Sequence, residues 1–243
     1  MDKIITYKPF GNQIILVEWE SKIDTSILKE IIRFKNKIEF QKKIPYTDLI
    51  VGYNSLAIKY KKPFLDFSIE LEILKSIEKI EIQTERDTNF IFEIPVCYDV
   101  NFGIDLEEIS AKSGLSIDKI IKLHSERSYT IFFIGFLPGF LYLGGLSEQL
   151  FFERKANPRI RVEKGSVAIG GQQTGVYPND SAGGWNVIGK TPINFFDIEN
   201  VNPCFAKAGD KVKFKPVCID EFHQLEKEVR VNTYQVLKIE ADA

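Results

Sequence analysis

Apolar residues recur along the first hundred residues with two different periods. Alternation with a period of two predicts strands, and apolar positions three and four residues apart predict amphipathic helices. The predicted elements are, in order, a strand at Asn12–Trp19, a helix that follows the N-cap residue Asp24 and ends near Phe40, two short strands around Gly52–Ser55, a helix at Leu65–Ile80 and a strand at Asn89–Tyr98. This β-α-β-β-α-β order predicts a small ferredoxin-like α+β domain.

The pattern changes after about residue 100. Two short helices come first, one at Asp105–Ser113, which Gly114 is expected to end, and one at Ser116–Glu126. Short apolar runs separated by glycine, proline and asparagine follow, and such spacing is typical of a β-barrel or a β-sandwich. After Phe222 the sequence predicts a further helix and an edge strand.

Composition divides the chain into two predicted domains, 1–88 and 89–243. The first part is rich in isoleucine and lysine and has few glycines, and Gln83–Asn89 is the expected linker. The 243 residues are enough for a sizeable hydrophobic core. The formal net charge is only -2 and the charges are spread along the chain, which argues against a nucleic-acid partner.

The most apolar segment, Tyr129–Leu146, is interrupted by Pro138 and by several glycines. A membrane helix needs about 20 largely apolar residues without such breaks, so we expect buried strands and a turn. The first residues lack the pattern of a secretory signal. Cys97, Cys204 and Cys218 are far apart and odd in number, so we expect each to pack as a small apolar residue, without a disulfide or zinc site. These features fit a cytoplasmic protein.

Residues Gly184–Thr191 match the phosphate-binding loop pattern G-x-x-x-x-G-K-[ST]. Such a loop must lead into a helix whose N-terminus faces the phosphate. Here the interior residues favour an extended strand, and Pro192 precedes another strand-like run, INFFDI. We therefore expect no phosphate-binding loop, but a β-hairpin arm that turns at Gly183–Gly184 and leaves Lys190 solvated.

Three stretches carry a more specific signal: FIGFLPGFLYLGGL at Phe133–Leu146, the segment Arg154–Pro178 with its GGQQTG run, and SAGGWNVIGKTP at Ser181–Pro192. In this order and spacing they resemble the family of prokaryotic 5-oxoprolinase B subunits, also called KipI or allophanate hydrolase subunit 1. The family does not reserve Lys190 for lysine, which supports the rejection of the phosphate loop. The resemblance implies an N-terminal α+β domain followed by a cyclophilin-like β-barrel.

The resemblance also implies an activity. Family members act with a KipA-like C subunit and with a separate A subunit to open 5-oxoproline to L-glutamate with ATP, so ATP with Mg²⁺ is the expected co-substrate and the chain alone is expected to be inactive. The active site would be composite, formed with the C subunit. Two alternatives remain open: inhibition of sensor histidine kinase autophosphorylation, and a part in an allophanate- or urea-linked amidohydrolase. We expect neither a bound metal nor a membrane partner.

Three charged or polar residues are candidates for catalysis outside the glycine-rich run. Arg159 and Arg161 lie two apart, which on a strand places both on one face, where a guanidinium pair binds carboxylate or phosphate. The alternative is a solvated strand face. His124 is a candidate proton carrier in a cleft, with a structural histidine that bonds a nearby backbone group as the alternative.

The GGQQTGVYP run supplies further candidates. Gly171 and Gly175 allow close approach to a ligand, Gln173 and Thr174 offer an amide and a hydroxyl suited to a lactam, and Tyr177 adds a phenol. Gln173 is assigned to catalysis and the other four to substrate binding. The alternative is a tight β-turn that needs glycine for its geometry only.

Aromatic residues complete the set. Trp185 and Asn186 are predicted to form a wall of the substrate site with a polar tip, although a core tryptophan fits the sequence equally well. The loop from Phe136 to Tyr142 is apolar and aromatic, and fits either the barrel core or the docking face for the C subunit.

Overall fold

The computed structural model describes residues 5–82 and 88–241. The chain forms two compact units, Met1–Asp87 and Thr88–Ala243. Most of the expected linker, Gln83–Asn89, lies outside the described residues.

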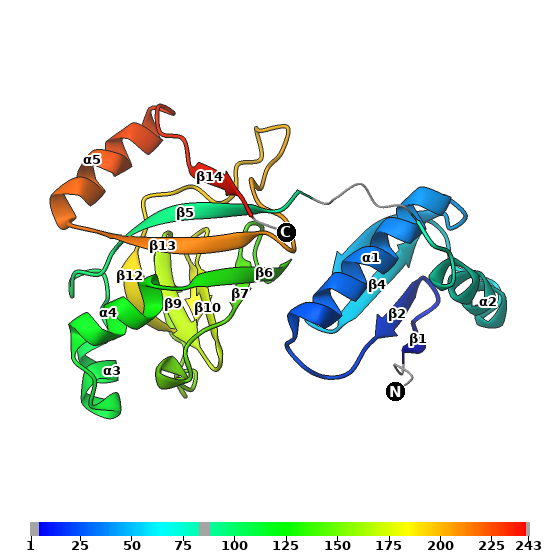
Figure 1. Ribbon diagram of the computed structural model, residues 1–243, viewed down its shortest axis with the longest axis horizontal. Helices are drawn as coiled ribbons and strands as arrows, with labels where there is room; N and C mark the ends of the chain where they lie inside the picture. Colours follow the sequence, from blue (N-terminus) through cyan, green and yellow to red (C-terminus); the bar gives the residue numbers. More distant parts are fainter. Residues whose placement is uncertain (1–4, 83–87, 242–243) are drawn as a thin grey trace. The chain divides into compact units, whose positions relative to one another are not determined.

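The first unit is an antiparallel sheet covered by two helices (Figure 1). Its sheet has the order β1-β2-β4-β3. The elements are β1 (Thr6–Phe10), β2 (Ile14–Glu18), α1 (Thr25–Gln41), β3 (Tyr46–Val51), β4 (Ser55–Tyr60) and α2 (Phe67–Glu78). Asp24 caps α1, because its carboxylate accepts a hydrogen bond from the Ser26 amide at 2.8 Å. Alternate residues of β2 and β4 are buried together with the apolar sides of both helices, which explains the two periods in the sequence.

One strand is placed differently from the prediction. The strand at Asn89–Tyr98 does not complete the small sheet but forms β5 (Phe90–Cys97) of the second unit. The edge of the small sheet beside β2 is formed instead by β1, in antiparallel register from Thr6 opposite Glu18 to Phe10 opposite Ile14. The α+β class is confirmed, with the edge strand supplied from the other end of the sequence.

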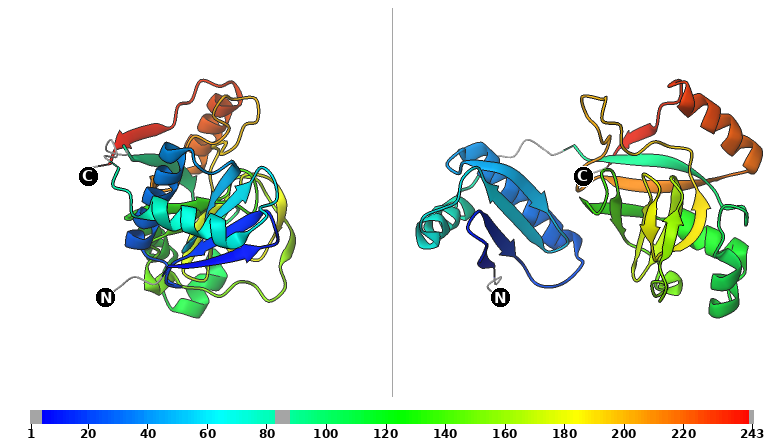
Figure 2. Two further views of the ribbon diagram at one scale, coloured as in Figure 1. Left: turned by 90° about the vertical axis from the view of Figure 1, so that its right-hand side faces the viewer. Right: turned by 180° about the vertical axis from the view of Figure 1, so that it is seen from behind.

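The second unit is a closed barrel of seven strands (Figures 1 and 2). Its strand order is β12-β9-β10-β7-β6-β13-β5, and the pairing of Lys190 with Cys97 closes the circle. The strands are β5, β6 (Ser128–Ile134), β7 (Leu141–Gly144), β9 (Ser166–Gly170), β10 (Gln173–Val176), β12 (Asn186–Lys190) and β13 (Lys211–Val217). The barrel implied by the resemblance is therefore confirmed.

Smaller elements surround the barrel. They are α3 (Leu106–Ser113), α4 (Ile117–Ser125), the short η1 (Glu148–Leu150), α5 (Ile219–Arg230), the edge strand β14 (Leu237–Glu240), which pairs with β5, and a two-stranded arm of β8 (Arg159–Val162) and β11 (Ser181–Gly183). Apolar residues of α3 and α4 pack into the same core as the inward-facing strand residues. Gly114 ends α3 in the left-handed conformation and Ser116 caps α4, as the sequence predicts.

The segment that matches the phosphate-loop pattern, Gly184–Thr191, forms the short connection after β11 and then β12. No helix follows, because residues 191–197 are irregular, so the expected strand there is wrong as well. The predicted hairpin arm is also wrong: β11 pairs with β8, while β12 pairs with β9 and β5. Lys190 is not simply solvated, since its ammonium group lies 2.6 Å from a carboxylate oxygen of Glu163.

Two further expectations concern apolar and sulfur-containing residues. The apolar segment Tyr129–Leu146 forms most of β6, a loop and β7, and no helix within residues 5–82 and 88–241 has the length and apolarity needed to cross a bilayer. All three cysteines are free. Cys97 is buried as expected, whereas Cys218 is exposed, so apolar packing is wrong for that residue.

Candidate functional site

His124 lies inside the barrel core rather than in an open cleft. Its side chain is fully buried, and its ring stacks on Phe214 with 4.7 Å between the ring centroids. The Nδ1 atom lies 2.7 Å from the Tyr98 hydroxyl and the Nε2 atom 2.8 Å from the Thr174 hydroxyl. Burial lowers the pKa of His124 to about 3, so the ring is neutral at neutral pH.

The hydrogen bonds around His124 define its tautomer. The Thr174 hydroxyl donates its single hydrogen to the Ala168 carbonyl oxygen at 3.0 Å. The Thr174 oxygen must therefore accept a hydrogen bond from Nε2–H of His124. Nδ1 then carries no hydrogen and accepts a hydrogen bond from the Tyr98 hydroxyl. The chain Tyr98–His124–Thr174–Ala168 therefore links the residue that follows β5 to α4, β10 and β9 across the core. Both His124 and Thr174 lie away from the barrel surface.

Strand β10 divides the GGQQTG candidates between two faces of the barrel wall. Because Thr174 points inward, Gln173 and Gly175 point outward. At Gly175 a Cβ atom would meet the Leu141 carbonyl oxygen at 3.1 Å and the ring of Phe140 at 3.2 Å, so glycine allows the close packing seen there. Gly171 has a positive φ of 61° at the first position of the two-residue β9–β10 turn, where glycine satisfies the backbone geometry.

An aromatic cluster covers the outer face of β9 and β10. It consists of Phe140, Val162, Ala168, Tyr177, Trp185 and Val187, with Leu137 and Tyr142 packed against it. The indole of Trp185 lies directly over Gly170, where a side chain would approach it to 2.8 Å. Gly170 is the cross-strand partner of Gln173, so the indole and the Gln173 side chain share one face as neighbours.

Gln173 carries an unsatisfied polar atom on this face. Its carboxamide oxygen is covered by neighbouring atoms and has no hydrogen-bond partner among the described residues. A buried acceptor left in this state costs about 1–3 kcal/mol, so it requires an explanation. Within the described part of the second unit, only Arg159 has another such atom, its Nη1.

Arg159 and Arg161 do not form a pair. The Nη2 atom of Arg159 lies 2.6 Å from Oδ1 of Asp105, whereas Arg161 binds Asp180 at 2.7 Å in an exposed position on the arm. The shared strand face is present, but a different carboxylate neutralises each guanidinium. The prediction that they act together on one anion therefore has no support in the geometry.

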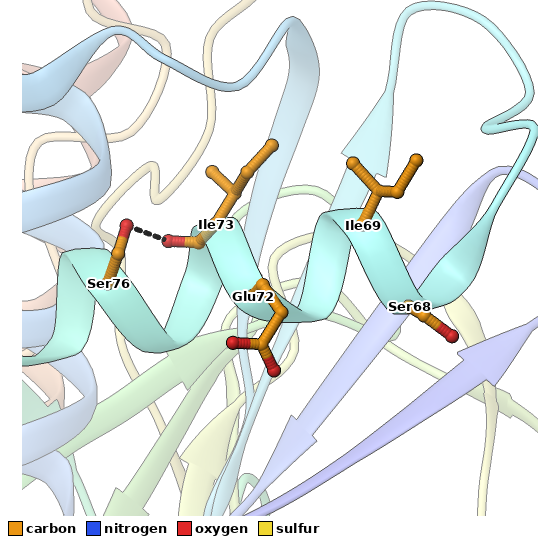
Figure 3. A pocket seen from close by; sticks show the side chains of 5 residues that line it. All are labelled: Ser68, Ile69, Glu72, Ile73 and Ser76. Atoms are coloured by element: carbon orange, nitrogen blue, oxygen red, sulfur yellow. Dashed lines mark hydrogen bonds between the residues drawn. The ribbon is translucent and has the colours of Figure 1, made fainter.

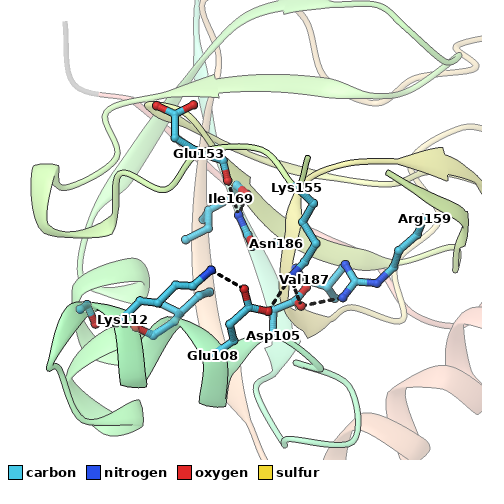
Figure 4. A network of polar contacts seen from close by, with 11 residues as sticks. Asp105, Glu108, Lys112, Glu153, Lys155, Arg159, Ile169, Asn186 and Val187 are labelled. Carbon is cyan, nitrogen blue, oxygen red and sulfur yellow. Dashed lines mark hydrogen bonds and ion pairs between the residues drawn. The ribbon is translucent and has the colours of Figure 1, made fainter. Parts of the chain in front are cut away.

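Asp105 organises a buried network that the sequence pattern did not reveal (Figure 4). Its side chain is 2 % exposed and lies between Arg159 and Lys155, whose ammonium group is 2.8 Å from Oδ1. The other oxygen, Oδ2, accepts a hydrogen bond from the Val187 amide at 2.7 Å. Asp105 stands at the N-cap of α3, but its carboxylate makes no capping hydrogen bond to that helix.

The network continues to the surface through Glu108. Lys155 also contacts Glu108 at 2.7 Å, and Lys112 contacts the same carboxylate at 2.6 Å (Figure 4). Hydrogen bonds from Lys112 and Lys155 lower the pKa of Glu108 to about 2. These contacts fix the start of α3 against β12 and the arm, so Arg159 has a clear structural function.

Asn186 and Tyr177 support the outer face. The Asn186 amide donates to the Glu153 carbonyl oxygen at 3.0 Å and is buried, so Asn186 holds the segment before the arm against the barrel. Tyr177 is buried beside Gly183, where a side chain would approach the phenol oxygen to 2.2 Å. Burial raises the pKa of Tyr177, so its phenol remains protonated at neutral pH.

The first unit has a groove of its own, of about 550 Å³, along α2 (Figure 3). It is lined by Ser68, Ile69, Glu72, Ile73 and Ser76. The lining contains a carboxylate and no cation, which makes it unsuited to a small anion. The described residues also contain no group of three or more histidine, cysteine, aspartate or glutamate side chains placed to bind a metal ion.

Known proteins share both the sequence and the fold. The family described as "Carboxyltransferase domain, subdomain C and D" matches residues 5–206. The 5-oxoprolinase B subunit of Escherichia coli O157:H7 is 36% identical over 85% of this chain and 93% of its own length. The chain belongs to the 5-oxoprolinase B-subunit family. The 5-oxoprolinase B subunit of Bacillus subtilis strain 168 is 39% identical over 75% of this chain and 78% of its own length.

The crystal structure of Kluyveromyces lactis urea carboxylase has the same fold, with a TM-score of 0.81 over 98% of this chain at 20% identity. This chain spans 24% of that larger chain. The family membership expected from the three sequence stretches is confirmed, and a protein of this family belongs with other subunits, as the names of its relatives state.

Proposed function

We propose that this chain is the B subunit of an ATP-dependent 5-oxoprolinase and contributes half of a composite active site with a KipA-like C subunit. The observation that carries the proposal is the outer barrel face, where the unpaired carboxamide oxygen of Gln173 lies beside the indole of Trp185. The similarity to curated 5-oxoprolinase B subunits supports the choice of substrate.

The reaction explains why such a face is useful. In this proposal the lactam oxygen attacks the γ-phosphorus of ATP bound with Mg²⁺, and ADP leaves. Water adds to the activated carbon, and the C–N bond breaks with the nitrogen leaving as the amine. A second water hydrolyses the resulting acyl phosphate to glutamate and phosphate. Phosphoryl transfer depends mainly on positioning and charge neutralisation, so substrate orientation is the contribution expected of this chain.

In this proposal the partly exposed Gln173 side chain turns its unpaired oxygen toward the substrate and accepts a hydrogen bond from the lactam N–H. The indole of Trp185, which is only 5 % exposed, supports that face from beneath. The exposed ring of Phe136 lies in the same region, packed against Phe140, and would contribute to the docking face for the C subunit. Phe136 has a positive φ of 65°, a conformation that a bulky residue rarely adopts and that marks a locally strained loop.

Reconstitution tests the proposal. The purified A and C subunits from the same organism are assayed for 5-oxoproline-dependent ATP hydrolysis and glutamate release, with and without this chain. We expect turnover only when all three are present, because the B and C subunits would each supply part of the site. The variant Gln173→Ala should lower kcat/KM at least about tenfold, the effect of one lost hydrogen bond to a reacting group.

Turnover by the A and C subunits alone would contradict the proposal, as would full activity of this chain without partners. If the chain binds the C subunit while the complex leaves 5-oxoproline intact, another amide substrate or inhibition of histidine kinase autophosphorylation becomes the better explanation. Kinase autophosphorylation is then the next assay.

A further inference from the structure

Three arginines lie within eight residues of one another, and two of them have their charge neutralised. Arg159 is paired with Asp105 and Arg161 with Asp180. Arg154 makes no ion pair with any described residue. Its guanidinium instead lies over the Trp185 ring, 5.6 Å from the ring centroid.

The backbone around Arg154 is held on both sides. The Phe152 carbonyl accepts a hydrogen bond from the Gly171 amide at 2.6 Å, and the Glu153 carbonyl accepts one from Asn186. On the other side, the Lys155 amide donates to the Gly184 carbonyl at 2.7 Å. Arg154 is exposed, and because its backbone is already held in place, a ligand that binds it has to order only its side chain.

Stacking leaves the charge of Arg154 available. A guanidinium that lies over an aromatic ring interacts through its planar face, while its N–H groups remain free to bind a carboxylate in a bidentate manner. Gln173, with its unpaired oxygen, is the neighbour of the same indole. A cation, an aromatic platform and a hydrogen-bond acceptor therefore lie together on one face of β9 and β10.

We propose that Arg154, stacked on Trp185 beside Gln173, binds the carboxylate of a small anionic amide. This inference rests on the proposed function for the choice of 5-oxoproline as that amide. Arg154 then binds the anion in place of Arg159 and Arg161, because Asp105 and Asp180 already form ion pairs with those two arginines. Gly171 and Asn186 then serve the site indirectly, as positioning residues for the Arg154 segment.

The test compares Arg154→Ala with Arg161→Ala in the complex with the A and C subunits. Arg161→Ala is a matched control, since it removes an exposed arginine of the arm that pairs with Asp180 and leaves Trp185 and Gln173 unchanged. We expect Arg154→Ala to raise KM for 5-oxoproline about 10–100-fold, the effect of losing a charge-assisted hydrogen bond, with a smaller change in kcat. Arg161→Ala should leave both constants within about twofold.

A binding measurement separates this inference from the proposed function. Equilibrium dialysis of radiolabelled 5-oxoproline with the complex needs no turnover, and 2-pyrrolidinone is the same lactam without the carboxylate. The wild-type complex should prefer 5-oxoproline over 2-pyrrolidinone, and Arg154→Ala should remove most of that preference. Binding without turnover would refute the proposed function and leave the inference standing. Unchanged KM and unchanged preference in Arg154→Ala would overturn the inference, as would absence of both turnover and binding.

Discussion

Replacing Asp105 with asparagine is expected to lower the free energy of unfolding of the barrel unit by about 2–3 kcal/mol. Asparagine keeps the size and retains an acceptor for the Val187 amide, but it removes the charge between Lys155 and Arg159. Removing one partner of a buried pair costs about 3–5 kcal/mol, because the remaining charge is desolvated without compensation. The two cations are 18% and 27% exposed, so water relieves part of that cost.

Each unit contains one tryptophan, which allows the unfolding of the barrel to be followed by itself. In a Trp19→Phe background, Trp185 emission reports only the second unit during urea unfolding. Glu108→Gln is the control, since it breaks two contacts of a surface carboxylate and should cost less than about 1 kcal/mol. An Asp105→Asn protein as stable as the parent, or a control equally destabilised, would show that the buried charge does not organise this end of the barrel.

Lowering the pH is expected to destabilise the barrel unit already at pH values well above those at which carboxylates titrate. The pKa of His124 is about 3 in the folded protein because of burial, and about 6.5 in an unfolded chain. The unfolded state therefore binds the proton more tightly between these values. The contribution of the neutral ring to stability is complete above about pH 6.5 and is lost as the pH falls toward 3, at roughly 1.4 kcal/mol per pH unit.

Urea unfolding at pH 7, 6 and 5, followed through Trp185, measures this slope. Glu108 and other carboxylates with a lowered pKa act only below about 4.5, so they do not contribute in this window. Replacing His223 with glutamine in every sample removes the second histidine of the chain. His124→Gln should abolish most of the slope between pH 6.5 and 5. Equal slopes in the two proteins would mean that His124 is not held neutral in the core.

Local sequence signals were sufficient for most helices and strands. Asp24, Gly114 and Ser116 mark helix ends because capping depends on neighbouring backbone groups. The partner of a strand depends on distant residues, and no local rule placed β1 at the edge of the small sheet or paired β11 with β8. For the same reason, the sequence did not show that the strand predicted at Asn89–Tyr98 belongs to the barrel, where it forms β5.

The candidate site was predictable to the same limited extent. The GGQQTG run and Trp185 directed attention to one part of the barrel wall, and the register of β10 then decided which side chains of that strand face outward. The spacing of Arg159 and Arg161 gave a shared face but not their carboxylate partners, which come from distant parts of the chain. The contacts of Asp105 and Arg154 also involve residues distant in the sequence, so neither residue could be recognised as important from the sequence alone.

The most direct test of the central claim locates 5-oxoproline on the barrel surface. The chain is labelled with 5-fluorotryptophan, which gives one ¹⁹F NMR signal from each unit, and is assembled with the A and C subunits. Addition of 5-oxoproline should shift the Trp185 signal in a saturable manner and leave the Trp19 signal unchanged. If the assembled complex converts 5-oxoproline while the Trp185 signal does not move, the outer face of β9 and β10 is not the substrate site.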